Sequence, residues 1–111
     1  MLYTLNEQAV TALQLTTADV IENGTNYYRM ATLDTAIRGH KKEAIDLLLK
    51  DQYPISTDKE ITIELTDNGK AKVNTETGIL TWDTKLNAGE TKKYRISYKV
   101  KYPKDKIISN L

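Results

Sequence analysis

The stretch that decides the fold is Thr91–Pro103, TKKYRISYKVKYP. Apolar and polar side chains alternate along it without a break: Tyr94, Ile96, Tyr98, Val100 and Tyr102 against Lys93, Arg95, Ser97, Lys99 and Lys101. A period of two is what a strand with one buried and one hydrated face requires, whereas a helix would scatter these aromatic residues around its circumference. We therefore predict a long, half-buried strand over residues 92–102. Its neighbours should be antiparallel, because parallel strands are usually apolar on both faces.

The composition is that of an ordinary globular domain. A chain of 111 residues can bury a single core without staples. With 40% hydrophobic and 28% charged residues, it is neither disordered nor membrane-spanning. The 16 basic residues nearly cancel the 15 acidic ones, so no overall field attracts nucleic acid or an anionic membrane. We expect no nucleic-acid partner and no membrane insertion.

The absence of cysteine excludes disulfides, thiol catalysis and thiolate metal sites, but it leaves the cellular compartment open. The first residues, MLYTLNEQAV, lack the basic segment and apolar run of a signal peptide. We expect either a start inside a longer gene or a terminus set by design, so the residues alone leave the localisation unknown.

The chain before Thr91 divides into short alternating segments separated by turn residues. Further strands are predicted over residues 27–38, 44–49, 61–66, 70–74 and 80–86. Asp67-Asn68-Gly69-Lys70 is the strongest hairpin turn, since Asn-Gly supplies positive φ values, and residues 87–90 form another. About seven short strands predict an all-β, immunoglobulin-like antiparallel β-sandwich with Trp82 in its core.

Side-chain faces follow from the same alternation. Over residues 27–38 we place Leu33, Thr35 and Ile37 inward and leave Arg29 and Asp34 for water; over residues 80–86, Leu80, Trp82 and Leu86 face the core.

The first 25 residues have no clean periodicity. Residues 5–15 fit a short amphipathic helix, and residues 10–15 fit a Thr-rich strand, which we favour. We divide the chain into an N-terminal segment, residues 1–25, that supplies a strand to the first sheet, and a β-sandwich domain, residues 26–111.

Four segments in order carry a resemblance to a known family: DQYPIST (51–57), ETGILTW (76–82), GET (89–91) and YKVKYPK (98–104). Residues 43–106 resemble the C-terminal part of the domain of unknown function in mucoidy-inhibitor-like (MuiA-like) bacterial proteins. The resemblance implies a terminal β-sandwich module of a longer protein that is periplasmic, in the cell envelope or extracellular. It implies no catalytic residues.

Catalytic and metal chemistry finds little support among the residues. His40 is the only histidine and lies in a lysine-flanked turn, which favours a solvated loop residue. Carboxylates cluster in sequence at Asp51, Asp58, Glu60, Glu64 and Asp67, but their order fits no EF-hand loop and solvated positions are favoured. We expect no enzyme activity, no catalytic residue, no metal and no cofactor.

The sharpest candidate for binding is the basic face formed by Lys93, Arg95, Lys99 and Lys101. Such residues also prevent edge-to-edge aggregation, and we expect Glu64 and Asp83 on neighbouring strands to pair with them. Tyr53, Tyr98 and Tyr102 are candidates for a carbohydrate platform, but their inward register favours core packing, as for Trp82, with Pro54 closing a strand.

The function we expect is a non-catalytic structural or protein-interaction module. Its partners would be another protein or sister domains of a longer chain, with a weak homodimer through exposed strand edges. The alternative is a surface module that binds an anionic or glycan ligand through the lysine-rich face.

Overall fold

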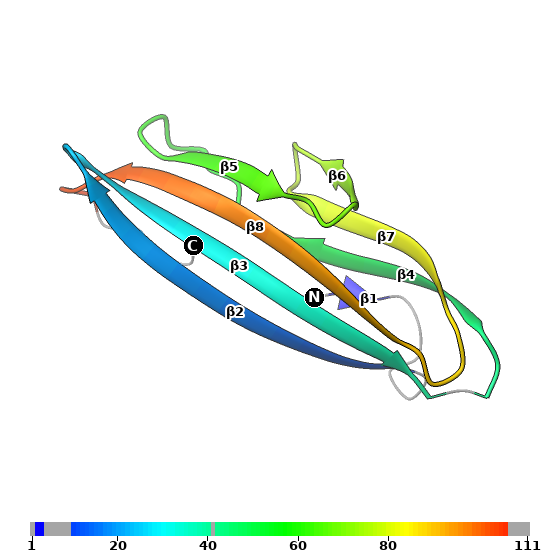
Figure 1. Ribbon diagram of the computed structural model, residues 1–111. Helices are drawn as coiled ribbons and strands as arrows, with labels where there is room; N and C mark the ends of the chain where they lie inside the picture. The colour runs from blue at the N-terminus through cyan, green and yellow to red at the C-terminus, as the bar shows by residue number, and fades with distance from the viewer. Residues whose placement is uncertain (1, 4–9, 41, 107–111) are drawn as a thin grey trace.

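The computed structural model describes residues 2–3, 10–40 and 42–106, and it confirms an all-β sandwich. Eight strands lie within these residues: β1 (Leu2–Tyr3), β2 (Val10–Asn23), β3 (Asn26–Gly39), β4 (Ile45–Gln52), β5 (Thr62–Asp67), β6 (Lys72–Asn74), β7 (Ile79–Leu86) and β8 (Thr91–Pro103). They form two antiparallel sheets, a long sheet in the order β2-β3-β8-β5 and a short sheet in the order β1-β4-β7-β6 (Figure 1). The part of the chain described here has no helix long and apolar enough to cross a membrane.

The predicted long strand is confirmed as β8. It pairs antiparallel with β3 on one side and β5 on the other, so it is central in the long sheet. Ile96, Tyr98 and Val100 are buried, while Lys93 and Arg95 are exposed, as the alternation predicts.

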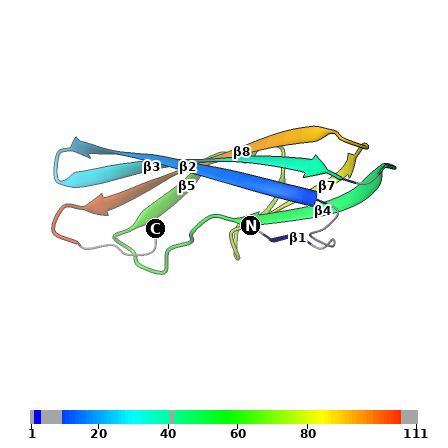
Figure 2. The same cartoon turned by 90° about the horizontal axis from the view of Figure 1, so that it is seen from below.

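The two sheets pack face to face around one core (Figure 2). The largest side chains that are fully buried in it are Ile37, Leu47, Leu49, Leu80, Leu86, Ile96 and Val100. Burial of each such side chain stabilises the fold by about 1.5–3 kcal/mol. The predicted inward positions of Leu80, Trp82 and Leu86 are confirmed.

The strand predicted over residues 10–15 is confirmed and continues to Asn23. Strand β2 pairs with β3 from Val10↔Gly39 to Asn23↔Asn26 with no register shift, so residues 10–15 are not helical. The remainder of the alternative helix, residues 5–9, lies outside the described residues. Gly24 has φ +63° in the two-residue turn that joins the strands.

Two predicted hairpins are wrong, because the strands on either side of each turn belong to different sheets. β5 pairs with β8 in the long sheet, whereas β6 pairs with β7 in the short sheet. Likewise β7 and β8 lie in different sheets. The turns at residues 67–70 and 87–90 are therefore crossings from sheet to sheet.

One face assignment is also wrong. Arg29 was expected in water, but it has the parity of Ala31 and Leu33 and so lies on the inner face of β3, opposite Val20 and Val100. Its side chain is half-buried, and Nη1 is buried without a hydrogen-bond partner. The long aliphatic stem of arginine makes this position tolerable.

Candidate functional site

The predicted basic residues share the outer face of the long sheet. Lys93, Arg95, Lys99 and Lys101 alternate along β8 with the buried residues, so all four point away from the short sheet. These four residues form a row of cations along β8. The number of them that pair with carboxylates decides how much positive charge a ligand would meet.

Arg95 is neutralised by a residue that the sequence analysis missed. Asp34 lies directly opposite it on β3, with Nε 2.6 Å from Oδ1 and Nη2 3.1 Å from Oδ2. This hydrogen-bonded pairing lowers the pKa of Asp34 and raises the pKa of Arg95. Long-range strand order was needed to find Asp34, because it is 61 residues away along the chain.

Lys99 is partly neutralised, and the two remaining cations are not. Lys99 Nζ lies 3.5 Å from Oε2 of Glu64 on β5, as expected, and 5.8 Å from the ring centroid of Tyr28. The other expected partner, Asp83, is wrong: it lies in the short sheet, opposite Leu48. Within the described chain, neither Lys93 nor Lys101 has a carboxylate within ion-pairing distance.

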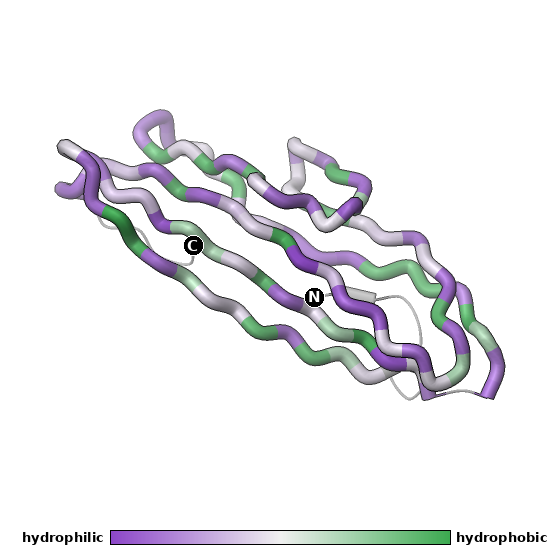
Figure 3. Tube along the Cα trace, viewed as in Figure 1, coloured by the Kyte–Doolittle hydropathy of each residue, from purple (hydrophilic) through white to green (hydrophobic). Residues whose placement is uncertain are grey.

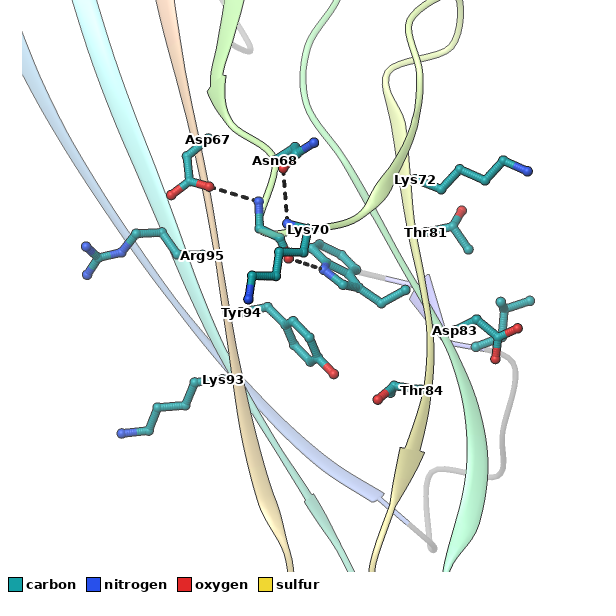
Figure 4. A pocket seen from close by; sticks show the side chains of 13 residues that line it. Asp67, Asn68, Lys70, Lys72, Thr81, Asp83, Thr84, Lys93, Tyr94 and Arg95 are labelled. Atoms are coloured by element: carbon teal, nitrogen blue, oxygen red, sulfur yellow. Dashed lines mark hydrogen bonds between the residues drawn. The ribbon is translucent and has the colours of Figure 1, made fainter.

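A groove of about 850 Å³ opens beside Lys93 and Arg95, between β7, β8 and the β5–β6 turn (Figure 4). The rings of Trp82 and Tyr94 form its aromatic floor, with centroids 5.1 Å apart and planes tilted by 42°. Further side chains on its rim are Asp67, Asn68, Lys70, Lys72, Thr81, Asp83 and Thr84. The groove thus combines an apolar floor with a rim that carries both cations and anions, while the Lys93 and Arg95 side chains point to the other side of β8.

The β5–β6 turn is held rigidly at this groove. Trp82 Nε1 donates a hydrogen bond to the carbonyl oxygen of Gly69 at 2.8 Å. Asp67 Oδ1 accepts from Gly69 N at 2.9 Å, and Asn68 Oδ1 accepts from Lys70 N at 3.0 Å, so two side chains support the turn from within. The Asn-Gly sequence still makes a tight reversal, although it joins two sheets.

The free edge of β2 is the second notable surface. Four large apolar side chains are exposed on this strand: Leu13 (73%), Leu15 (62%), Ile21 (50%) and Val20 (55%). No described strand pairs with the side of β2 that faces away from β3. Figure 3 shows hydrophobic residues recurring along β2, at the lower margin of the sheet in that view.

Leu13 and Leu15 connect this edge to the basic row. Together with Asp34, Ala36, Lys93 and Arg95 they line a hollow of about 470 Å³ on the outer face of the long sheet. Apolar side chains therefore lie beside the cation of Lys93, whereas Arg95 is paired with Asp34.

Asp51 corrects a further expectation, since it is buried rather than solvated. Its Oδ2 accepts a hydrogen bond from Gln14 Nε2 at 2.8 Å, and its Oδ1 accepts from Gln52 N at 2.8 Å. Gln14 also donates to Thr35 Oγ1 at 3.1 Å, so one polar cluster ties β2 to the short sheet.

A family model for a domain of unknown function, DUF4139, matches residues 10–104. The chain belongs to this family. No curated protein and no solved structure matches it. The DUF4139 match includes all four segments that carried the sequence resemblance, and it includes β2, which the resemblance did not reach.

The remaining predicted residues of this DUF4139 domain lie apart from the basic row. Tyr53 and Tyr98 are buried in the core, and Tyr102 is half-buried 5.7 Å from the ring of Tyr27, so they form no exposed platform. Pro54, half-buried, follows Tyr53 just beyond β4.

The histidine and the carboxylates Asp58 and Glu60 have separate surroundings in the described chain. His40 is exposed and hydrogen-bonded to Thr11. Asp58 and Glu60 both contact Lys106, which lowers the pKa of Asp58 through a side-chain hydrogen bond. Among the residues described, no group of three or more His, Asp or Glu side chains is arranged to hold a metal ion.

Proposed function

We propose that this DUF4139 domain is a non-catalytic interaction module that binds a protein partner by adding a strand to the free edge of β2. The observation that carries the proposal is the length and exposure of that edge. A strand of 14 residues leaves a long row of backbone donors and acceptors for a partner.

The register shows which backbone groups of β2 point outward. Gly39 N donates to Glu90 O, and Lys104 N donates to Thr25 O, so the odd-numbered residues of β3 and its turn direct their N–H and C=O groups toward β8. The even-numbered residues of β3 therefore direct theirs toward β2. Their partners on β2 are odd-numbered. It follows that the even-numbered residues of β2, including Ala12, Thr16 and Val20, present N–H and C=O groups to the free edge.

Several devices that protect sheet edges are missing from the described residues of β2. Edge strands are commonly blocked by charged residues, especially lysine, by proline, by a bulge or by a covering loop. β2 has no proline, no lysine, no arginine and no shift in its pairing with β3, and its charged residues are Asp19 and Glu22. A long, regular edge with exposed leucine and isoleucine is the kind of surface that binds another strand.

The setting we propose comes from the sequence resemblance. Membership of the MuiA-like branch would make this domain the C-terminal part of a longer bacterial envelope or exported protein. A partner strand would then come from a sister domain, from another envelope protein or from a second copy.

The test uses a photo-crosslinking amino acid placed at Leu15 in the chain expressed in its own cells. We expect crosslinks from Leu15 and none from Lys101, which lies on the same face two strands away. Thr16→Pro should abolish them, since it removes an outward N–H while β3 pairing stays intact. The matched Thr17→Pro change removes an inward N–H and should unfold the hairpin instead. Absence of crosslinks at Leu15, or their persistence in a folded Thr16→Pro variant, would refute the proposal.

A second candidate, binding of an anionic glycan, is favoured by one observation. The groove of Figure 4 has Lys70 and Lys72 on its rim beside an aromatic floor, while Lys93 and Arg95 point to the other side of β8. Lys70→Gln should then weaken binding of a sulfated oligosaccharide several-fold in calorimetry, and Lys101→Gln, outside the groove, should not. Equal effects of the two changes would indicate non-specific attraction to surface cations.

A further inference from the structure

A two-fold axis at Leu15 gives β2 a definite set of partners in a second copy. In VTALQLTTADV, residues 10–20, Val10 and Val20 stand at equal distances from Leu15, as do Ala12 and Ala18; the remaining pairs are Thr11 with Asp19, Leu13 with Thr17 and Gln14 with Thr16. In an interface between two copies related by a two-fold axis, each position of the strand meets the position at the same distance on the other side of the axis. We propose that β2 pairs antiparallel with β2 of a second copy about an axis at Leu15. The inference rests on β2 being the docking edge.

The backbone geometry allows this register. Ala12 would lie opposite Ala18, and Gln14 opposite Thr16, and all four are even-numbered residues with outward N–H and C=O groups. Each such pair exchanges two hydrogen bonds, which gives about twelve over the eleven paired residues. Leu15 would face its own copy at a non-hydrogen-bonded position, where Cα atoms approach to about 4.5 Å.

Charge favours this register. Asp19 is the only charged residue between Val10 and Ile21, and in this register it lies opposite Thr11 of the second copy. In the second copy, Thr11 pairs in turn with Arg38 of β3, whose side chain lies on the same face of the sheet. Asp19 and Arg38 are both exposed, and within the described chain neither has an ion-pair partner. Two Asp19–Arg38 contacts would thus flank the central leucines.

Two other registers are less favourable. An axis at Asp19 opposes two carboxylates, and an axis at Thr17 places Asp19 against Leu15 of the other copy. The basic rows on β8 do not oppose the dimer, because five strand spacings, about 24 Å, separate them. That distance exceeds the Debye length of about 8 Å at physiological ionic strength.

Disulfide crosslinking tests the register directly, because the chain has no cysteine of its own. Leu15→Cys should form a covalent dimer on mild oxidation, since a Cα separation near 4.5 Å is within disulfide reach. Leu13→Cys is the matched control: the residue is equally exposed, but its own copy would lie about 13 Å further along the strand. Leu13→Cys and Thr17→Cys should each stay monomeric alone and crosslink when mixed.

The outcomes separate the two proposals. Rapid crosslinking of Leu15→Cys, at least about tenfold faster than Leu13→Cys, together with twice the monomer mass for the reduced wild-type chain in sedimentation, supports the second copy. Faster crosslinking of Leu13→Cys overturns the register. Monomeric behaviour of every variant at several hundred micromolar overturns self-pairing. If the chain is monomeric but Leu15 crosslinks to a different protein in cells, the proposal that β2 is a docking edge is supported. If Leu15 gives no crosslink either, both the docking edge and the self-pairing are overturned.

Discussion

The turn at Gly69 offers a sharp test of how the groove is built. Gly69 has φ +60°, and its carbonyl oxygen accepts the hydrogen bond from Trp82. A Cβ added at this position would lie 2.5 Å from the carbonyl oxygen of Arg95. That oxygen belongs to β8, where Arg95 is paired with Asp34 of β3, so the strand cannot move away cheaply.

Two separate costs make up the expected effect of Gly69→Ala. The left-handed backbone alone costs an alanine about 1–2 kcal/mol. The contact with Arg95 requires the turn to shift, which adds a similar amount and brings the loss to about 3 kcal/mol. Gly89→Ala isolates the first cost, because Gly89 has φ +69° and no atom within 4 Å of the added Cβ. The control should therefore lose only about 1–2 kcal/mol.

The assay is urea unfolding, followed by the fluorescence of the single tryptophan and by circular dichroism. A difference of about 1.5 kcal/mol between the variants is measurable in a domain whose stability is on the order of 5–15 kcal/mol. Gly69→Ala should also shift the emission of Trp82, because its indole loses a fixed acceptor. Equal losses for Gly69→Ala and Gly89→Ala would refute the argument, since the turn would then move freely against β8.

Three further changes test other contacts. Gln14→Leu leaves a buried oxygen of Asp51 without its donor, and urea unfolding should show a loss of about 1–3 kcal/mol; an unchanged midpoint would mean that the cluster contributes nothing. Trp82→Phe removes the bond to Gly69 and should cost about 1 kcal/mol by circular dichroism, beyond any repacking seen with Trp82→Leu as comparison. Arg95→Gln should raise the pKa of Asp34 in carboxyl NMR titration, because the hydrogen bond that lowers it is lost. The pKa of Asp34 is lower in the folded state than in the unfolded state, so its ion pair stabilises the fold fully above the ordinary pKa of an aspartate. This stabilisation fades as the pH falls through the lowered value. Identical titrations of Asp34 in the wild type and in Arg95→Gln would contradict the pair.

Strand faces were largely predictable, because burial on one face imposes a period of two on the sequence. β8 is the clearest case: its five apolar residues all point inward and its polar residues outward or to the rim. Arg29 shows where the rule failed. Its charge suggested the solvent face, but parity places it inward with Leu33, so position along the strand was the better guide.

Strand partners were not predictable from turn chemistry. The Asn68-Gly69 turn is a true tight reversal, with Ala71 N donating to Asn68 O at 3.0 Å and positive φ at Gly69 and Lys70. A turn fixes the direction of the chain over four residues, whereas the sheet that each strand joins depends on distant partners. For the same reason Asp34 was missed as the partner of Arg95, and Asp83 was wrongly chosen.

The irregular pattern of residues 10–23 has a physical explanation in the position of β2. Period two appears only where one face is buried, and every described side chain of this strand except Ala12 is exposed. The hairpin of β2 and β3 therefore depends on β3 being held by β8, because an isolated hairpin is only marginally stable in water. Exposed apolar residues and a regular backbone edge are what a strand needs to be completed by a partner, so the segment hardest to predict from the sequence is the one that we expect to carry the interaction.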